Sequence, residues 1–161
     1  MKYQLHERMF AIGDDYWIET DGGRPAFKVD GKALRITKTL VLEALEGDEV
    51  LTIRKKLLSI RDTMEIERDG RTVATVEKAL VTPLRDRFSI EVEGGEDMEA
   101  KGDIVDHEYT IERGGDTVAA VSKRRFRMRD TYGIEIAEGV NDALILAVTV
   151  CIDQMSHGVD G

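Results

Sequence analysis

One uninterrupted apolar run near the end of the chain constrains the fold most. From Ala143 to Ile152 the sequence reads ALILAVTVCI, and Thr149 is its only polar residue. A membrane-spanning helix needs about 20 apolar residues, whereas this run is bounded by Asp142 and Asp153. We therefore expect the protein itself, and not a lipid bilayer, to bury the run.

The run is compatible with a buried strand or a buried helix. Its β-branched residues lower the helix propensity, but a strand would need protein against both of its faces. A helix has a suitable beginning, because Asn141 can cap it and Asp142 interacts favourably with the helix dipole. We predict a helix, and a helix that is apolar on every side must lie inside other structure.

Most of the remaining chain alternates between apolar and polar residues. The segments RFSIEVE (87–93) and DTYGIEIAE (130–138) show this pattern, which is typical of strands with one buried face. Glycine-containing turn signals separate the runs; they lie at 21–23, 30–31, 47–48, 69–70, 94–95 and 114–115. This spacing predicts an antiparallel meander of short strands.

An internal repeat lies within the meander. The segment IERDGRTVATVEK (66–78) aligns without a gap with IERGGDTVAAVSK (111–123), and nine of thirteen positions are identical. Each copy reads as strand, tight turn and strand, and a fainter copy covers 42–56 if its turn is shortened. Repeated antiparallel hairpins avoid exposed edges by closing into a barrel. A closed barrel would also provide an interior for the apolar helix.

Length and composition place the chain in a broad class. With 161 residues it fits one domain, which we expect to span 1–157, with a short tail at 158–161. A single cysteine cannot form an internal disulfide, and a reducing cytoplasmic compartment is therefore expected. A net charge of −9 disfavours nucleic acid as a partner.

The order of these features resembles the LURP-one-related family, whose fold is that of the tubby C-terminal domain. The resemblance covers nearly the whole chain and is carried by four segments: 11–34, 48–60, 64–80 and, most specifically, 101–155. It implies a mainly β fold, a closed antiparallel barrel of roughly a dozen strands around a buried hydrophobic C-terminal helix. In that fold Cys151 is a buried, inert thiol.

The strongest functional candidate is the basic segment SKRRFRMRD (122–130). Tubby domains bind phosphoinositide headgroups through basic residues, and the related phospholipid scramblases act at membranes. The resemblance therefore implies a site for anionic phospholipid. If the segment is a strand, its candidate residues Lys123, Arg125, Arg127 and Arg129 lie on one face, and Arg54, Lys55 and Lys56 would help them. The alternative is a solvated basic face paired with the acid-rich neighbouring strands, and the negative net charge favours it.

Two acidic clusters are candidate cation sites. One contains Asp103, Asp106, His107 and Glu108, and the other contains Glu135, Glu138 and Asp142. Neither has the spacing of an EF-hand loop, and acids at a helix entrance are explained by the helix dipole. We predict no metal site and no cofactor.

Catalytic motifs are missing from the sequence. It has no nucleophile elbow, P-loop, His-Glu-x-x-His or Cys-x-x-Cys motif, and His6, His107 and His157 are far apart. A barrel filled by a helix also lacks the usual concave pocket. We predict a noncatalytic binding or scaffold module, cytoplasmic and peripheral at a membrane if its ligand is lipid. A protein–protein interaction module without lipid is the alternative, and a small enzyme is the third hypothesis.

Overall fold

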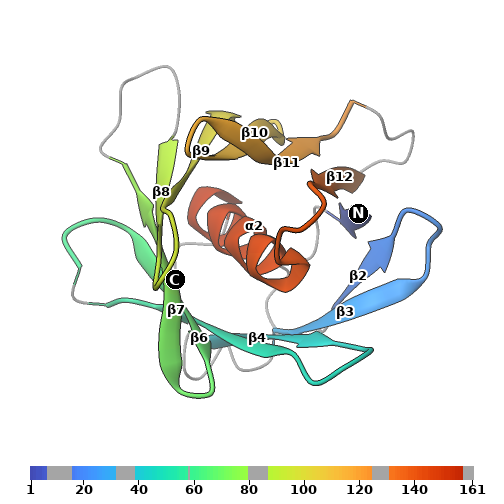
Figure 1. The fold of residues 1–161 in the computed structure, drawn as a ribbon, viewed down its shortest axis with the longest axis horizontal. Helices are drawn as coiled ribbons and strands as arrows, with labels where there is room; N and C mark the ends of the chain where they lie inside the picture. Colours follow the sequence, from blue (N-terminus) through green and yellow to red (C-terminus); the bar gives the residue numbers. More distant parts are fainter. Residues whose placement is uncertain (7–15, 32–38, 58, 80–86, 125–130, 158–161) are drawn as a thin grey trace.

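A closed antiparallel barrel surrounds a single helix in the part of the chain that the structure describes (Figure 1). The computed structural model describes residues 1–6, 16–31, 39–57, 59–79, 87–124 and 131–157. The helix, α2, spans Asp142–His157. The strands are β1 Lys2–His6, β2 Tyr16–Thr20, β3 Pro25–Asp30, β4 Thr39–Ala44, β5 Val50–Lys55, β6 Thr63–Arg68, β7 Arg71–Lys78, β8 Arg87–Val92, β9 Met98–Asp103, β10 Glu108–Arg113, β11 Asp116–Ser122 and β12 Thr131–Ile136. The tail predicted at 158–161 lies outside the described residues.

Closure of the barrel depends on the pairing of the first strand with the last. Each strand pairs with its neighbours in the chain, and β1 also pairs with β12, so that Tyr3 faces Ile134 and Leu5 faces Tyr132. The N-terminal ammonium group of Met1 donates a hydrogen bond of 2.9 Å to the carbonyl of Ile136. The predicted closed antiparallel barrel is therefore confirmed.

Alternation along the strands separates the core from the outer surface. In β8, for example, Phe88 and Ile90 are completely buried, whereas Ser89 and Glu91 are exposed. The inward side chains of the strands form one hydrophobic cluster with α2. Burying this much apolar surface is the main favourable contribution to folding.

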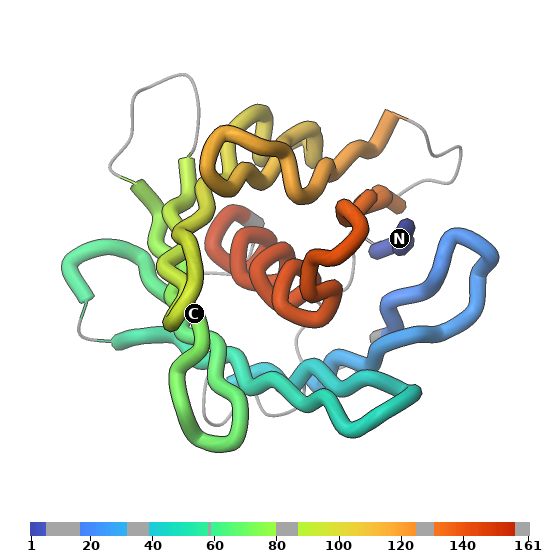
Figure 2. The backbone as a smooth tube through the Cα atoms, in the orientation of Figure 1, coloured from blue at the N-terminus to red at the C-terminus, as the bar shows by residue number. Residues whose placement is uncertain are grey.

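The apolar run forms the predicted helix, and Figure 2 shows α2 inside the ring of strands. The side-chain oxygen of Asn141 accepts a hydrogen bond of 3.1 Å from the amide of Leu144, as expected for an N-cap. Every residue from Ile145 to Ile152 is fully buried. Burial raises the pKa of the Cys151 thiol, which disfavours the reactive thiolate. None of the described helices has the length and apolar character needed to span a membrane.

The barrel has two different ends. Because neighbouring strands are antiparallel, all odd-numbered strands end at the same end, which we call the far end. The opposite, turn end carries the hairpin turns after β2, β4, β6, β8 and β10 and the connection from β12 to α2. Helix α2 begins at the turn end, where the Tyr3 hydroxyl donates a 2.7 Å hydrogen bond to Asp142, and it runs towards the far end.

The two copies of the repeat have the same hairpin geometry. Segment 66–78 lies in β6 and β7, and segment 111–123 lies in β10 and β11 and ends one residue beyond β11. The register shifts at equivalent places, between Ile66 and Glu67 and between Ile111 and Glu112. The third copy, 42–56, also forms a hairpin, β4–β5. Its connection, 45–49, is longer than the two-residue turns 69–70 and 114–115.

Candidate functional site

The basic segment begins where β11 ends, at the far end of the barrel. Strand β11 stops at Ser122, so Lys123 and Arg124 follow the strand, contrary to the expectation that Lys123 belongs to it. Both residues are exposed. Three further predicted members of the site on this segment, Arg125, Arg127 and Arg129, lie outside the described residues.

The carboxylate of Glu108, at the start of β10, holds the beginning of this segment. Its Oε1 accepts hydrogen bonds of 2.9 Å from the backbone amides of Lys123 and of Arg124. The Ser122 hydroxyl donates to the same carboxylate, at 2.9 Å from Oε2 and 3.1 Å from Oε1. The Arg124 guanidinium lies 3.8 Å away. One acidic side chain therefore fixes three consecutive residues.

The electrostatics of Glu108 follow from these contacts. Burial alone raises the pKa of its carboxyl group, but the hydrogen bonds from Arg124, Ser122 and Lys123 outweigh that effect. The net result is a lowered pKa, because these bonds favour the charged form. Glu108 is therefore ionised at neutral pH.

Positive charge is concentrated in the sequence that Glu108 anchors. Residues 122–130 contain five basic side chains and one acidic one, Asp130, in a chain of net charge −9. Glu108 balances one of the basic charges. The Arg124 side chain, at 86% exposure, extends into solvent. The sequence that follows Ser122 therefore contains more basic than acidic residues.

The second basic cluster lies on a different wall of the barrel. Strands β5 and β11 are six positions apart in the ring of strands, and Figure 1 shows β4 and β6 on the side of α2 opposite β11. The Arg54 side chain contacts Glu67 at 3.3 Å, and Lys56 lies 3.8 Å from Glu65. The structure therefore does not bring Arg54, Lys55 and Lys56 together with Lys123.

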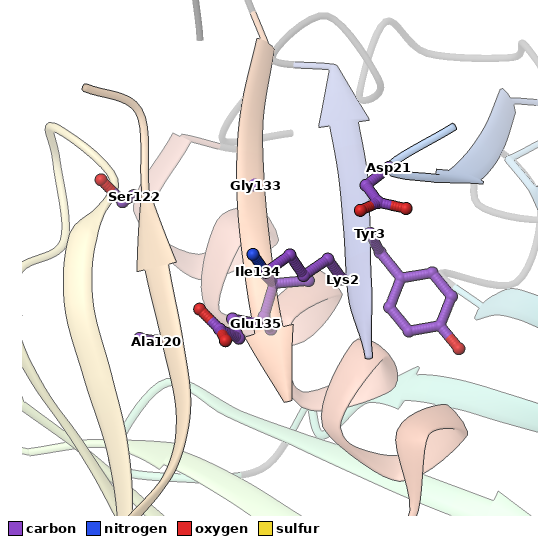
Figure 3. A pocket seen from close by; sticks show the side chains of 8 residues that line it. All are labelled: Lys2, Tyr3, Asp21, Ala120, Ser122, Gly133, Ile134 and Glu135. Carbon is purple, nitrogen blue, oxygen red and sulfur yellow. The ribbon is translucent and has the colours of Figure 1, made fainter. Parts of the chain in front are cut away.

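A hollow lies on the outer surface beside the start of the basic segment (Figure 3). It has a volume of about 290 Å³ and crosses β11, β12 and β1. Its small residues, Ala120 and Gly133, leave space between larger side chains. Lys2 and Glu135, which are direct cross-strand partners, also line it. Ser122 lines the same hollow, so the hollow adjoins Lys123.

A buried polar cluster holds the last turns of α2 at the far end. Asp153 is fully buried and accepts a hydrogen bond from the Tyr132 hydroxyl. The His107 ring stacks on Tyr132, with ring centres 4.1 Å apart, and its Nδ1 lies 3.6 Å from the Asp153 carboxylate. Burial and the Asp153 charge raise the pKa of Tyr109 far above its ordinary value, and contact with Thr149 partly opposes them.

The structure separates the residues of the first acidic cluster. Asp103 accepts a hydrogen bond of 3.1 Å from the amide of Asp106 within the turn, and His107 points inward to Tyr132. Glu108 instead faces Ser122 on the neighbouring strand. Within the described ranges, no group of three or more metal-binding side chains is present.

Sequence reasoning considered Glu108 only as a possible cation ligand and missed its contact with the basic segment. The repeat contains the missing signal. At the spacing of 45 residues, Thr63 and Glu77 correspond to Glu108 and Ser122. The members of each pair face each other across their hairpin. Thr63 pairs directly with Glu77. Tyr109 pairs with Val121, and this register places Glu108 opposite Ser122. The hydroxyl and the carboxylate have thus exchanged strands.

Comparisons with known proteins identify the family. Residues 1–153 match the model of the family described as LURP-one-related. The uncharacterised protein YxjI of Bacillus subtilis (strain 168) is 26% identical over 153 residues, which cover 95% of this chain and 92% of that protein. Protein LURP-one-related 15 of Arabidopsis thaliana is 22% identical over 168 residues, covering 93% of this chain and 77% of that protein. No solved structure matches significantly. The chain belongs to the LURP-one-related family.

Proposed function

We propose that the protein is a noncatalytic binding module that takes anionic phospholipid headgroups at the far end of the barrel. Lys123 and Arg124 form the described part of the site. The observation that carries the proposal is the anchoring of these two residues by Glu108. Because their backbone is held in place, their side chains meet a ligand with less loss of conformational freedom than a loose chain would pay.

The filled interior supports a role for the outer surface. Helix α2 occupies the barrel and its residues from Ile145 to Ile152 are fully buried. Enzymes that act on small molecules usually bind their substrates in concave sites with convergent polar groups. A binding site on the rim of the barrel suits this architecture better, and it leaves catalysis outside the proposal.

The concentration of charge supports an anionic membrane surface as the ligand. Basic residues near an anionic leaflet each contribute about 1 kcal/mol to binding. Five such residues lie between Lys123 and Arg129. Lipid headgroups at the membrane surface can contact several of them at once, which favours the membrane over a single small anion.

Sedimentation with vesicles tests the proposal. The purified chain is mixed with phosphatidylcholine vesicles or with vesicles that also contain phosphoinositide, each at low and at physiological salt. We expect binding to the anionic vesicles alone, weakened by salt because screening shortens the range of the attraction. Equal sedimentation with both kinds of vesicle, or with neither, would contradict the proposal.

A matched pair of charge reversals locates the site. The double variant Lys123→Glu/Arg124→Glu should lose most of the binding. The variant Lys55→Glu/Arg54→Glu has the same change in charge but lies on the other wall, and it should retain binding. If both variants lose binding equally, overall charge rather than this site controls the association.

Protein–protein interaction is the second candidate function. The hollow formed around Gly133, with Ser122 in its lining, is the observation that favours it. In that case the vesicle assays give no binding, and a specific protein is retained by the unaltered chain. Filling the hollow with Ala120→Trp should then abolish retention of that protein.

A further inference from the structure

The two copies of the repeat diverge immediately after their last shared residue. The amide of Lys78 donates a 2.9 Å hydrogen bond to the backbone carbonyl of Asp62, and the next amide, of Ala79, bonds to the carbonyl of Arg87 at 2.8 Å. Both are bonds between backbone groups of neighbouring chain segments. At the end of the first copy, therefore, Lys78 and Ala79 still bond to the backbone on either side of β7.

The second copy replaces these bonds with bonds to a side chain. The amides of Lys123 and Arg124, which correspond to those of Lys78 and Ala79, both bond to Glu108 Oε1. The chain leaves the strand at this point and enters a turn. The Glu108 carboxylate thus takes the place of a sheet partner and determines where the two basic residues leave the barrel.

We infer that Glu108 is a positioning residue for the anionic ligand, acting through the backbone of Lys123 and Arg124. The inference rests on the function proposed above. Glu108 does not contact the ligand itself. It holds the backbone from which the two basic side chains extend towards the headgroup.

The sign of the Glu108 charge makes this role testable. A carboxylate beside an anion site repels the ligand, so its charge alone opposes binding. Its hydrogen bonds have the opposite effect, because they order the residues that bind. A variant that removes the charge but retains an acceptor separates these two effects.

The substitutions Glu108→Gln and Glu108→Ala form this matched pair. Both remove one negative charge, but glutamine keeps a carbonyl oxygen that can accept from the two amides and an NH₂ group that can donate to Ser122. Alanine keeps neither. Fixing backbone dihedrals before binding lowers the conformational entropy that binding costs, and the backbone of two ligand-binding residues is affected here.

We expect Glu108→Ala to bind phosphoinositide-containing vesicles about tenfold more weakly than Glu108→Gln, which corresponds to 1.4 kcal/mol. Glu108→Gln should bind as tightly as the unaltered chain or more tightly. Ser122→Ala, which leaves the charge unchanged and removes one bond to the carboxylate, should give a smaller loss. Thermal melting of each variant checks that the barrel remains folded at the assay temperature.

The possible results distinguish the inference from the function on which it rests. If the unaltered chain binds but the two Glu108 variants bind equally, the positioning role is wrong and the anionic site stands. If Glu108→Ala binds more tightly than Glu108→Gln, the carboxylate competes with the ligand, and the inference is again overturned. If the unaltered chain does not bind anionic vesicles, the function and the inference both fail.

Discussion

The β6–β7 and β10–β11 hairpins have closely similar sequences and the same register shift, but they differ at the far end of the barrel. In the first hairpin Glu77 forms an ion pair of 3.0 Å with Arg61, and the amides of Lys78 and Ala79 bond to backbone carbonyls. In the second, Glu108 accepts the amides of Lys123 and Arg124, and the chain turns away. The shared residues thus form the hairpin, and the residues that differ determine whether the amides at its end bond to a side chain or to the backbone.

The inner faces of the two hairpins differ in the same region. Met64 of β6 and Tyr109 of β10 occupy equivalent positions in the repeat, and both are buried. Met64 adds to the apolar packing, whereas Tyr109 lies near the Thr149 hydroxyl and the Asp153 carboxyl group. The second hairpin therefore faces the polar end of α2, and its surroundings differ from those of the first on both sides of the barrel wall.

The largest effect on stability is expected in α2, because both hairpins share one hydrophobic core with this helix. Val148→Asp places an unpaired charge on the fully buried part of α2, which should remove at least about 5 kcal/mol of stability and unfold the domain. Circular dichroism and urea unfolding measure this. Ile60→Asp, the same kind of change at an exposed apolar residue, should leave stability nearly unchanged. A folded, cooperative Val148→Asp variant would contradict the account of the core.

Substitutions of Asp153 test the difference between the inner faces of the two hairpins. Asp153→Ala removes the acceptor of the buried Tyr132 hydroxyl and should cost about 3 kcal/mol in the free energy of unfolding. Asp153→Asn keeps an acceptor and should cost less. The measurement is urea unfolding followed by hydrogen exchange, in which β12 and β10 should lose protection before β6 and β7. Equal losses for the two variants would mean that the hydrogen bond is unimportant.

The hairpin turns should show equal effects in the two copies. Gly70 and Gly115 have φ values of 77° and 87°, and an added Cβ would meet no atom within 4 Å at either position. Substitution by alanine therefore costs backbone conformation alone, about 1 kcal/mol in each case. Thermal melting of Gly70→Ala and Gly115→Ala compares them. A clear difference between the two would show that the turns are not equivalent.

The sequence predicts the parts of the structure that depend on local pattern. The length of the apolar run and the Asn141 cap predict α2, and strand alternation with frequent turns predicts the meander. The repeat predicts two similar hairpins, because the same thirteen-residue pattern makes the same local contacts. Closure follows from the need to cover strand edges, and the structure confirms each of these predictions.

Long-range polar contacts could not be predicted in the same way. Pairing of Glu108 with Ser122 requires knowledge of the strand register, and the cluster of Asp153, Tyr132 and His107 depends on how far α2 extends into the barrel. The alternation of charge from Lys123 onwards predicts one basic face if the segment is a strand. The chain instead leaves the strand at Lys123, because a carboxylate binds its amide and the next one.

The smallest expected effect gives the most direct test of the difference between the copies. The pKa of Glu108 is lowered from its ordinary value of 4.5, so its hydrogen bonds stabilise the folded state above the unfolded pKa. That contribution is lost as the pH falls through the lowered, folded-state pKa. The amides that Glu108 binds should report this protonation, whereas an amide bonded to a backbone carbonyl should not.

The decisive measurement is an acid titration followed by ¹H–¹⁵N NMR of the amides of Lys123, Arg124 and Lys78. We predict that the Lys123 and Arg124 signals move together at a pH below 4.5, and that Glu108→Ala abolishes this movement. The Lys78 signal should stay in place, since its amide bonds to the carbonyl of Asp62. Two results would contradict the central claim that the Glu108 carboxylate binds the amides after β11. One is an equal response of the Lys78 and Lys123 signals, and the other is a Lys123 signal that still titrates in Glu108→Ala.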